Sequence, residues 1–229
     1  MDEKAYWHEY ELTRNDVHIA IESFYTNQEV NNCAAENPSI YDAINKESSF
    51  WIIQQYGLQI AFFLALGRIF DTDRRSHTID KFLSTTVAHP EFFSKDALAA
   101  RKQGGGPKPD WLDHFLIGVC EPSAAELSVF QTALEPWKSR FETVYKPIRN
   151  KVFAHRALTH PGQGDALFSN TQIKEVDELL YSLWDIMESI WQLYHNGTKP
   201  TIGKRTYDYR ERIKKSTFSV LSGLIRNAP

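Results

Sequence analysis

Apolar side chains recur at the three-to-four-residue spacing of amphipathic helices along most of the chain, and no segment alternates apolar and polar residues over a convincing strand length. Five long segments carry this spacing, at about 5–34, 40–70, 123–156, 171–194 and 206–225. Shorter helices are expected at 78–87, within 90–102 and at 111–119. The pattern therefore predicts an all-α bundle of four to five principal helices with additional short helices.

Prolines and glycines separate these segments. Asn37-Pro38-Ser39 interrupts the pattern after the first helix, and Pro38 is well placed to begin the next one. The run from Gln103 to Pro109 contains three glycines, but it lacks the Gly-Lys-Ser/Thr ending and the preceding strand of a phosphate-binding loop. We interpret it as a linker. The segment at 40–70 is apolar on all sides, which favours a central position in the bundle.

The length of 229 residues is enough for one domain that buries most of its apolar surface in a single core. We expect one domain over residues 1–229, with its core at about 40–195. The helix at 5–34 precedes this core, and a basic helix at about 206–225 follows it. The basic helix is expected either to pack on the chain late in folding or to pack on a partner protein.

The stretch from Phe141 to Arg156 carries the candidate chemistry. An apolar stripe on its predicted helix is formed by Val144, Ile148 and Val152 and is extended by His155. Six basic side chains crowd the same region: Lys138, Arg140, Lys146, Arg149, Lys151 and Arg156. A cationic cluster beside a titratable imidazole suits a bound phosphate.

Arg149 and His155 do not share one face of an ideal helix. Residues six apart lie roughly 120° around the axis and about 9 Å along it. The reach of the arginine, fraying at the helix end or a kink at Pro147 can each reduce this mismatch. Two copies of the helix around a two-fold axis would instead line one cleft with two arginines and two histidines. Asn150 would supply a neutral donor and acceptor to orient either group.

Two runs of residues resemble a known superfamily. Arg149-Asn150, followed after four residues by His155, resembles the Arg-polar-x-His signature of HEPN domains. The run from Leu64 to Asp71, with Ile79-x2-Phe-Leu83 after it, is similar to the AbiU-type HEPN branch associated with bacterial abortive infection. The resemblance implies an obligate homodimer with a shared Arg/His cleft. It also implies metal-independent cleavage of RNA, with no cofactor.

The implied chemistry is attack on an RNA phosphate by the neighbouring 2′-hydroxyl. His155 can serve as base or acid near neutral pH, and the Arg149 fork can bind phosphate oxygens. The resemblance favours a bacterial defence or toxin effector, with an antitoxin or another defence protein as a further partner. A surface arginine and a core histidine remain the structural alternative. Two functional alternatives also remain, an RNA-binding or sensing module without turnover and a partner-binding subunit.

Other polar groups are weaker candidates. Arg68 and Asp71 stand three residues apart near a helix end, either as an exposed ion pair or as groups that orient the cleft. Weak RNA-binding candidates on the C-terminal helix are Arg210, Arg212, Lys214 and Lys215, which Tyr207 and Tyr209 accompany. A solvated helix face is the alternative for this last group. A nucleotidyltransferase-modified tyrosine, which some HEPN proteins carry two positions after the histidine, is replaced by Ala157.

Charge and cysteine usage narrow the remaining classes. The formal net charge is −3, with ten acidic and three basic residues in 1–50 and eight basic and two acidic residues in 199–229. Cys33 and Cys120 are the two cysteines and form no metal or redox motif, so no metal site is expected. The N-terminus has no signal-peptide pattern, and the apolar stretch from Phe50 to Phe70 is interrupted by polar residues. We therefore expect a cytoplasmic protein that does not span a membrane.

Overall fold

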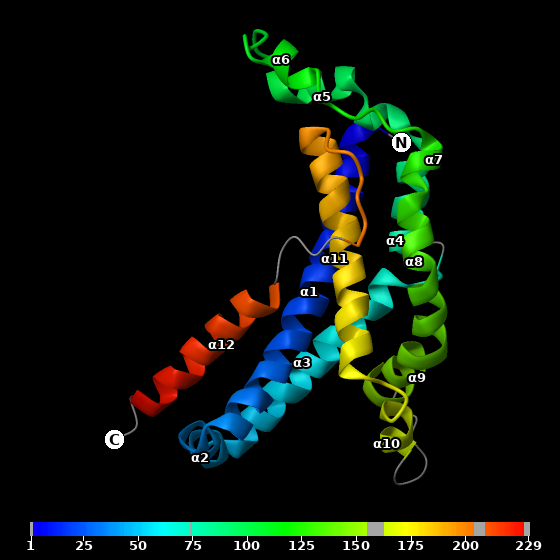
Figure 1. The fold of residues 1–229 in the computed structure, drawn as a ribbon. Helices are drawn as coiled ribbons and strands as arrows, with labels where there is room; N and C mark the ends of the chain where they lie inside the picture. The colour runs from blue at the N-terminus through cyan, green and yellow to red at the C-terminus, as the bar shows by residue number, and fades with distance from the viewer. Residues whose placement is uncertain (1, 74, 155–162, 204–208, 227–229) are drawn as a thin grey trace.

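The regular structure of the chain is helical throughout the residues that the structure describes (Figure 1). The computed structural model describes residues 2–73, 75–154, 163–203 and 209–226, and no strand occurs in these ranges. The predicted all-α class is therefore confirmed.

Two long antiparallel helices form the base of the bundle. Helix α1 runs over Glu3–Glu36 and begins at Asp2, whose side chain accepts a hydrogen bond from the Ala5 N–H at 2.7 Å. Helix α3 runs over Ser48–Ile69 and packs along α1. Side chains near opposite ends of the pair link the two helices: Asp16 binds Arg68 at 2.7 Å, and Asn27 donates to the Gln55 carbonyl at 3.2 Å.

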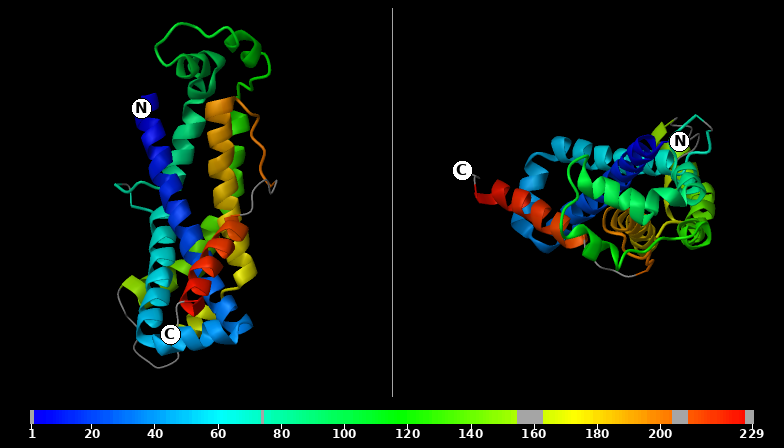
Figure 2. Two further views of the ribbon diagram at one scale, coloured as in Figure 1. Left: turned by 90° about the vertical axis from the view of Figure 1, so that its left-hand side faces the viewer. Right: turned by 90° about the horizontal axis from the view of Figure 1, so that it is seen from above.

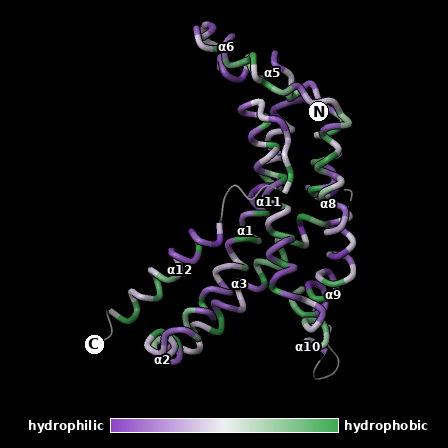
Figure 3. The backbone as a smooth tube through the Cα atoms, in the orientation of Figure 1, coloured by the Kyte–Doolittle hydropathy of each residue, from purple (hydrophilic) through white to green (hydrophobic). Residues whose placement is uncertain are grey.

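The segment expected as one helix at 40–70 is two helices. The Asn37 side chain caps α2, Pro38–Lys46, and Glu47 interrupts the helix with φ −115° and ψ 42°. The expectation that this segment is buried all round is also wrong. Phe50, Ile52 and Ile53 are exposed, whereas Phe62, Phe63 and Leu66 in the second half of α3 are packed in the core. Hydropathy along the chain (Figure 3) does not show which side of α3 is left uncovered.

Short elements lead from α3 through the bundle to the other end of the molecule (Figure 1). They are α4 at Ile79–Ala88, a 3-10 turn at Pro90–Phe93, α5 at Lys95–Gln103 and α6 at Leu112–Leu116. The glycine-rich run follows α5 as a loop. Gly104 adopts a left-handed conformation with φ 59° and ends α5, as glycine does at many helix C-termini.

The segment that carries the motif is a chain of short helical pieces. These are α7 at Ala124–Leu127, α8 at Val129–Arg140, the π-helical turn η2 at Phe141–Tyr145, α9 at Lys146–Ile148 and the π-helical turn η3 at Arg149–Ala154. Helix α10, Gln163–Phe168, then leads to the long helix α11, Ile173–Asn196. Gly197, with φ 61°, ends α11 as the sequence predicts.

The core lies where α1, α3, α4, α8 and α11 meet. Tyr6 and Tyr10 of α1 are fully buried in it, and their hydroxyls bond Thr86 and the Met187 carbonyl at 3.0 and 3.1 Å. Helix α1 is therefore part of the same core as the later helices. Val144 and Ile148, two members of the predicted apolar stripe, are buried there as well.

Helix α12, Tyr209–Arg226, packs on α1 and α2 of its own chain (Figure 2). Ile213, Thr217 and Leu221 form its buried side, and Leu221 joins a small second core with Val30 and Ile40. The sequence left open whether this helix packs on a partner. The structure shows that one side of α12 is occupied within the chain and that the opposite side is exposed.

One helix in the described ranges, α3, is long and apolar enough to cross a membrane by length and composition alone. Its second half is a core helix, because Phe62, Phe63 and Leu66 are each 5% exposed or less. This combination is weak evidence for a span, since core helices meet the same criteria.

Candidate active site

The motif segment widens into a π-helical turn on each side of Pro147. The Lys146 N–H bonds the Phe141 carbonyl, five residues back, in place of the four-residue spacing of an α-helix. Proline has no N–H to donate, and its ring would clash with the carbonyl of Thr143 in a regular helix. We attribute the altered winding to this proline. The sequence predicted a kink here, and the structure has a change of helix type immediately before Arg149.

Arg149 lies against α3. Its Nε is 2.9 Å from the position that a Cβ on Gly67 would occupy, so the guanidinium fills space that only a glycine leaves open. Its Nη1 donates to Asn150 Oδ1 at 2.8 Å, which is the orienting contact expected of Asn150. The Nε is buried and has no acceptor among the described residues. Burial of an unsatisfied donor costs free energy, so this geometry suits a group that meets an acceptor on binding.

Aromatic rings fix η3 on α3. Phe153 stacks on Phe63 with 4.8 Å between ring centroids and lies 6.0 Å from Tyr56. Phe168 of α10 contacts both phenylalanines from the side. These contacts hold the turn that carries Arg149 and Asn150. His155 and Arg156, the other predicted groups of the motif, lie outside the described residues.

A buried polar network anchors the same segment from the other side, and the sequence analysis missed it. Glu175 of α11 accepts hydrogen bonds from the Tyr145 hydroxyl at 2.5 Å and from Arg140 Nε at 2.7 Å. Burial alone would raise the pKa of Glu175, but these two bonds outweigh it, and the net pKa is lowered. Acidic residues are common in the first turn of a helix, so the sequence around Glu175 did not indicate that it would bind Tyr145 and Arg140.

The predicted relation between Arg68 and Asp71 is not found. Arg68 binds Asp16 of α1 at 2.7 Å, while Asp71 accepts from the Ser76 hydroxyl at 2.8 Å and from the Asp73 N–H at 3.1 Å. Helix α3 ends at Ile69, so Asp71 belongs to the following loop and no longer shares a helical face with Arg68. Arg68 is half exposed on the helix that contacts Arg149, and neither side chain bonds the motif residues that the structure describes.

The predicted crowd of cations is largely neutralised by carboxylates from elsewhere in the fold. Lys138 binds Asp80 at 3.0 Å, and Lys146 binds Glu142 at 2.7 Å. Arg140 is held by Glu175, as described above. Lys151 is exposed on η3. On α12, Arg212 binds Glu22 at 2.5 Å, whereas the side chains of Arg210, Lys214 and Lys215 are exposed.

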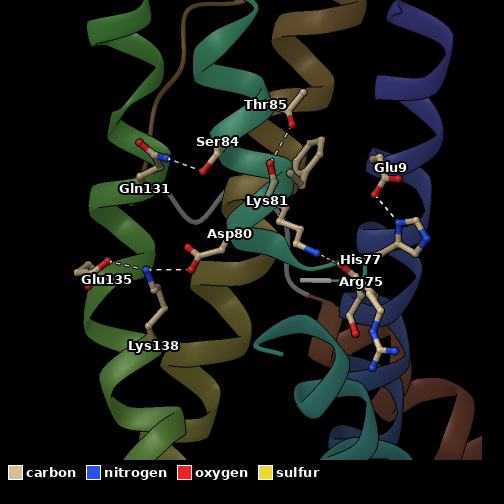
Figure 4. Close-up of a pocket in the computed structure, with 12 residues that line it drawn as sticks. Glu9, Arg75, His77, Asp80, Lys81, Ser84, Thr85, Gln131, Glu135 and Lys138 are labelled. Atoms are coloured by element: carbon tan, nitrogen blue, oxygen red, sulfur yellow. Dashed lines mark hydrogen bonds and ion pairs between the residues drawn. The ribbon is translucent and has the colours of Figure 1, made fainter. Parts of the chain in front are cut away.

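A large groove of about 850 Å³ lies between α4 and α8 and is lined also by Glu9 and by the loop before α4 (Figure 4). Its charged groups are engaged within the chain, and Arg75 binds Asp73 while Lys81 donates to the Asp73 and Ser76 carbonyls. His77 Nδ1 lies 2.7 Å from Glu9 Oε2, and Lys138 lies between Asp80 and Glu135. A polyanion in this groove would meet three carboxylates, so we do not place the phosphate site there.

The cysteines and acidic side chains of the described ranges form no metal-binding group. Cys33 is buried, and burial raises its pKa to about 11, which does not favour a thiolate ligand. Among the described ranges, no three His, Cys, Asp or Glu side chains come together as a metal-binding group. That the function needs no metal stays a prediction.

Comparisons with known proteins agree with the motif. A search of curated proteins and a search of solved structures each found no match. The family model described as AbiU2, of the HEPN type, matches residues 4–213 and so includes both quoted runs and the first five residues of α12. By this match the chain belongs to the AbiU2 family of abortive-infection-associated HEPN domains.

Proposed function

We propose that this protein is a metal-independent endoribonuclease of the HEPN type that acts in bacterial defence or as a toxin. The observation that supports it most directly is the environment of Arg149. Its guanidinium is positioned by Gly67 and Asn150, and its buried Nε has no acceptor among the described residues. An arginine fork held in this way can bind phosphate oxygens and stabilise the negative charge that develops during cleavage.

The proposed reaction is an internal transfer. The 2′-hydroxyl loses its proton to a base and attacks the adjacent phosphorus, the bond to the 5′-oxygen breaks, and that oxygen receives a proton. His155 is the proposed base or acid, since an unperturbed imidazole has a pKa of about 6.5. The products are a 2′,3′-cyclic phosphate and a 5′-hydroxyl. Arg149 holds the phosphate oxygens throughout, and Asn150 orients Arg149.

The proposed active unit is a homodimer. Arg149 and His155 are six residues apart in the sequence, and two copies around a two-fold axis would bring a second pair to the same cleft. RNA is the substrate, and an antitoxin or another defence protein is a proposed partner. The proposed location is the cytoplasm, where RNA is available.

Purified protein and single-site variants incubated with total RNA in EDTA test this proposal. The wild type should cut RNA and leave cyclic phosphate ends. Arg149→Ala and His155→Ala should each lower the rate roughly 10²-fold or more, as loss of one transition-state donor does. Arg149→Lys should recover only part of the activity, because an ammonium cannot reproduce the two-pronged contact.

Thermal melts and light scattering are the controls, since His155 extends an apolar stripe and its loss can affect stability. A folded double variant that still cuts RNA would contradict the assignment of the site. Wild-type protein that binds RNA without cutting it would instead favour an RNA-binding or sensing module. Protein that does neither would favour the partner-binding subunit.

A further inference from the structure

Helix α3 has one face that nothing in the described chain covers. It lies at the edge of the molecule in both views of Figure 2. Phe62, Leu66 and Ile69 pack toward α1 and the core, and a second face, at Phe63 and Gly67, meets η3. The remaining face contains Phe50, Ile53, Gly57, Ile60 and Leu64, which we call the outer face of α3. Phe50 and Ile53 are 55% and 62% exposed.

The spacing of these residues is that of a helix-pairing seam. The intervals from Phe50 to Leu64 are three, four, three and four residues, the repeat that keeps one apolar stripe toward a partner helix. Gly57 lies at the centre of the stripe, and no atom comes within 4 Å of the position of its missing Cβ. A glycine at this point lets a second backbone approach closely.

We propose that the outer face of α3 is the surface through which two copies of this chain pair. The inference rests on the homodimer of the proposed function and identifies its interface. A two-fold interface is self-complementary, so a charge near the axis meets its own copy. Residues 48–67 contain no Asp, Glu, Lys, Arg or His. The face is therefore free of the like-charge repulsion that Lys214 and Lys215 would cause if α12 paired with itself.

The dimensions of the face fit such a pair. The fifteen residues from Phe50 to Leu64 span about 21 Å of helix, or nearly four turns. A stable interface buries about 800 Å² on each partner, and a buried aromatic side chain contributes roughly 150–250 Å². The exposed Gln54 amide beside the face can enlarge the contact. The outer face ends at Arg68, and Asp16 neutralises the charge of this arginine.

Pairing along this face has a consequence for the site. Gly67, which contacts Arg149, lies on α3 beside the outer face and one turn after Leu64. A parallel pair, with the two-fold axis along the two copies of α3, therefore brings the Arg149 of each copy to the same end of the interface. This is the arrangement that a shared cleft requires.

The test is the mass of matched variants in solution. Ile53→Asp places a charge on the outer face one turn before Gly57, and Ile117→Asp makes the same change at a 76% exposed position near α6. Light scattering at micromolar concentration should give twice 26.5 kDa for the wild type and for Ile117→Asp, and 26.5 kDa for Ile53→Asp. The wild type and Ile117→Asp should melt at similar temperatures, whereas Ile53→Asp should stay helical by circular dichroism and lose the stability that pairing adds. Ile53→Ser replaces Ile53→Asp if that variant is insoluble.

The outcomes separate the two proposals. A monomeric wild type would overturn both the paired face and the homodimer of the proposed function. A dimeric wild type with a dimeric Ile53→Asp would overturn this face alone and leave a homodimer through another surface. A lipid surface is the other candidate for contact with this face, and sedimentation with phosphatidylcholine and phosphatidylglycerol vesicles tests it. If Ile53→Asp stays dimeric but loses vesicle binding that the wild type shows, the face contacts lipid and the pairing is wrong.

Discussion

Gly67 and Arg149, which are 82 positions apart in the sequence, lie in direct contact, with Arg149 Nε 2.9 Å from where a Cβ on Gly67 would stand. Real Cβ contacts essentially never occur at this distance. The Leu-Gly-Arg run of one signature and the Arg-Asn pair of the other therefore meet in space. The glycine is part of the arginine's environment because it has no side chain.

Gly67→Ala is expected to displace the Arg149 guanidinium while the fold is kept. The new methyl group must push aside a side chain in a packed region, which costs about 1–3 kcal/mol of stability. A gain in helix propensity of up to about 1 kcal/mol offsets part of that cost. RNA cleavage should fall nearly as far as it does in Arg149→Ala. Activity assays and chemical denaturation of the same preparations measure both effects.

Gly223→Ala is the matched control, since Gly223 is also helical and has no atom within 4 Å of its missing Cβ. It should leave cleavage unchanged and raise stability slightly through helix propensity. Normal cleavage by Gly67→Ala would show that the position of Arg149 beside α3 does not matter for activity.

The network at Glu175 predicts a pH dependence of stability. The folded-state pKa of Glu175 is lowered relative to the unfolded chain, so its contribution is complete above the unfolded pKa, about 4.3. That contribution is lost as the pH falls through the folded pKa. Glu175→Gln should cost about 1–2 kcal/mol at pH 7, because bonds to a neutral amide replace bonds to a carboxylate. The difference from wild type should shrink below about pH 4.

Denaturant titrations at pH 7, 5 and 3.5 measure this difference. Tyr145→Phe removes one of the two donors without changing the titrating group, so its cost should vary less with pH than that of Glu175→Gln. A cost for Glu175→Gln that stays constant down to pH 3.5 would contradict the assigned role of its charge.

Local chemistry made much of the fold predictable. Pro38 after Asn37 and Gly197 after α11 each marked a helix boundary, because capping depends on a few neighbouring residues. The apolar stripe at Val144 and Ile148 was also predictable, because residues four apart in one segment share a helical face. The contact between Arg149 and Asn150 could be expected because the two residues are adjacent.

Contacts between distant segments could not be predicted in this way. Arg68 pairs with Asp16, which is 52 residues away, and not with the nearby Asp71. Arg140 pairs with Glu175, which is 35 residues away. No local pattern distinguishes such partners from other exposed acids. Apolar composition likewise could not show which side of α3 meets the core and which is left uncovered. The role of Gly67 depends on a neighbour that only the folded chain supplies.

The exposed side of α12 gives the last prediction, that its lysines add RNA affinity without adding chemistry. Removal of the helix is a poor test, because Ile213, Thr217 and Leu221 are buried on α1 and α2 and their loss would expose the second core. Reversal of charge on the exposed side leaves that packing intact. The double variant Lys214→Glu, Lys215→Glu should bind RNA more weakly at low salt. The slope of log affinity against log salt should fall by about 1.4, since roughly 0.7 counterions are released for each contact with a single strand.

The double variant Lys95→Glu, Lys108→Glu is the matched control, because α5 and the loop after it lie at the end of the molecule opposite to α12 (Figure 1). It changes the net charge by the same amount and should alter the slope less. Equal weakening in both variants would indicate a general charge effect. Unchanged binding in the α12 variant would show that this side is a solvated helix face. Cleavage at saturating RNA should be the same in all three proteins, because the α12 lysines are expected to hold the strand and Arg149 and His155 to act on it.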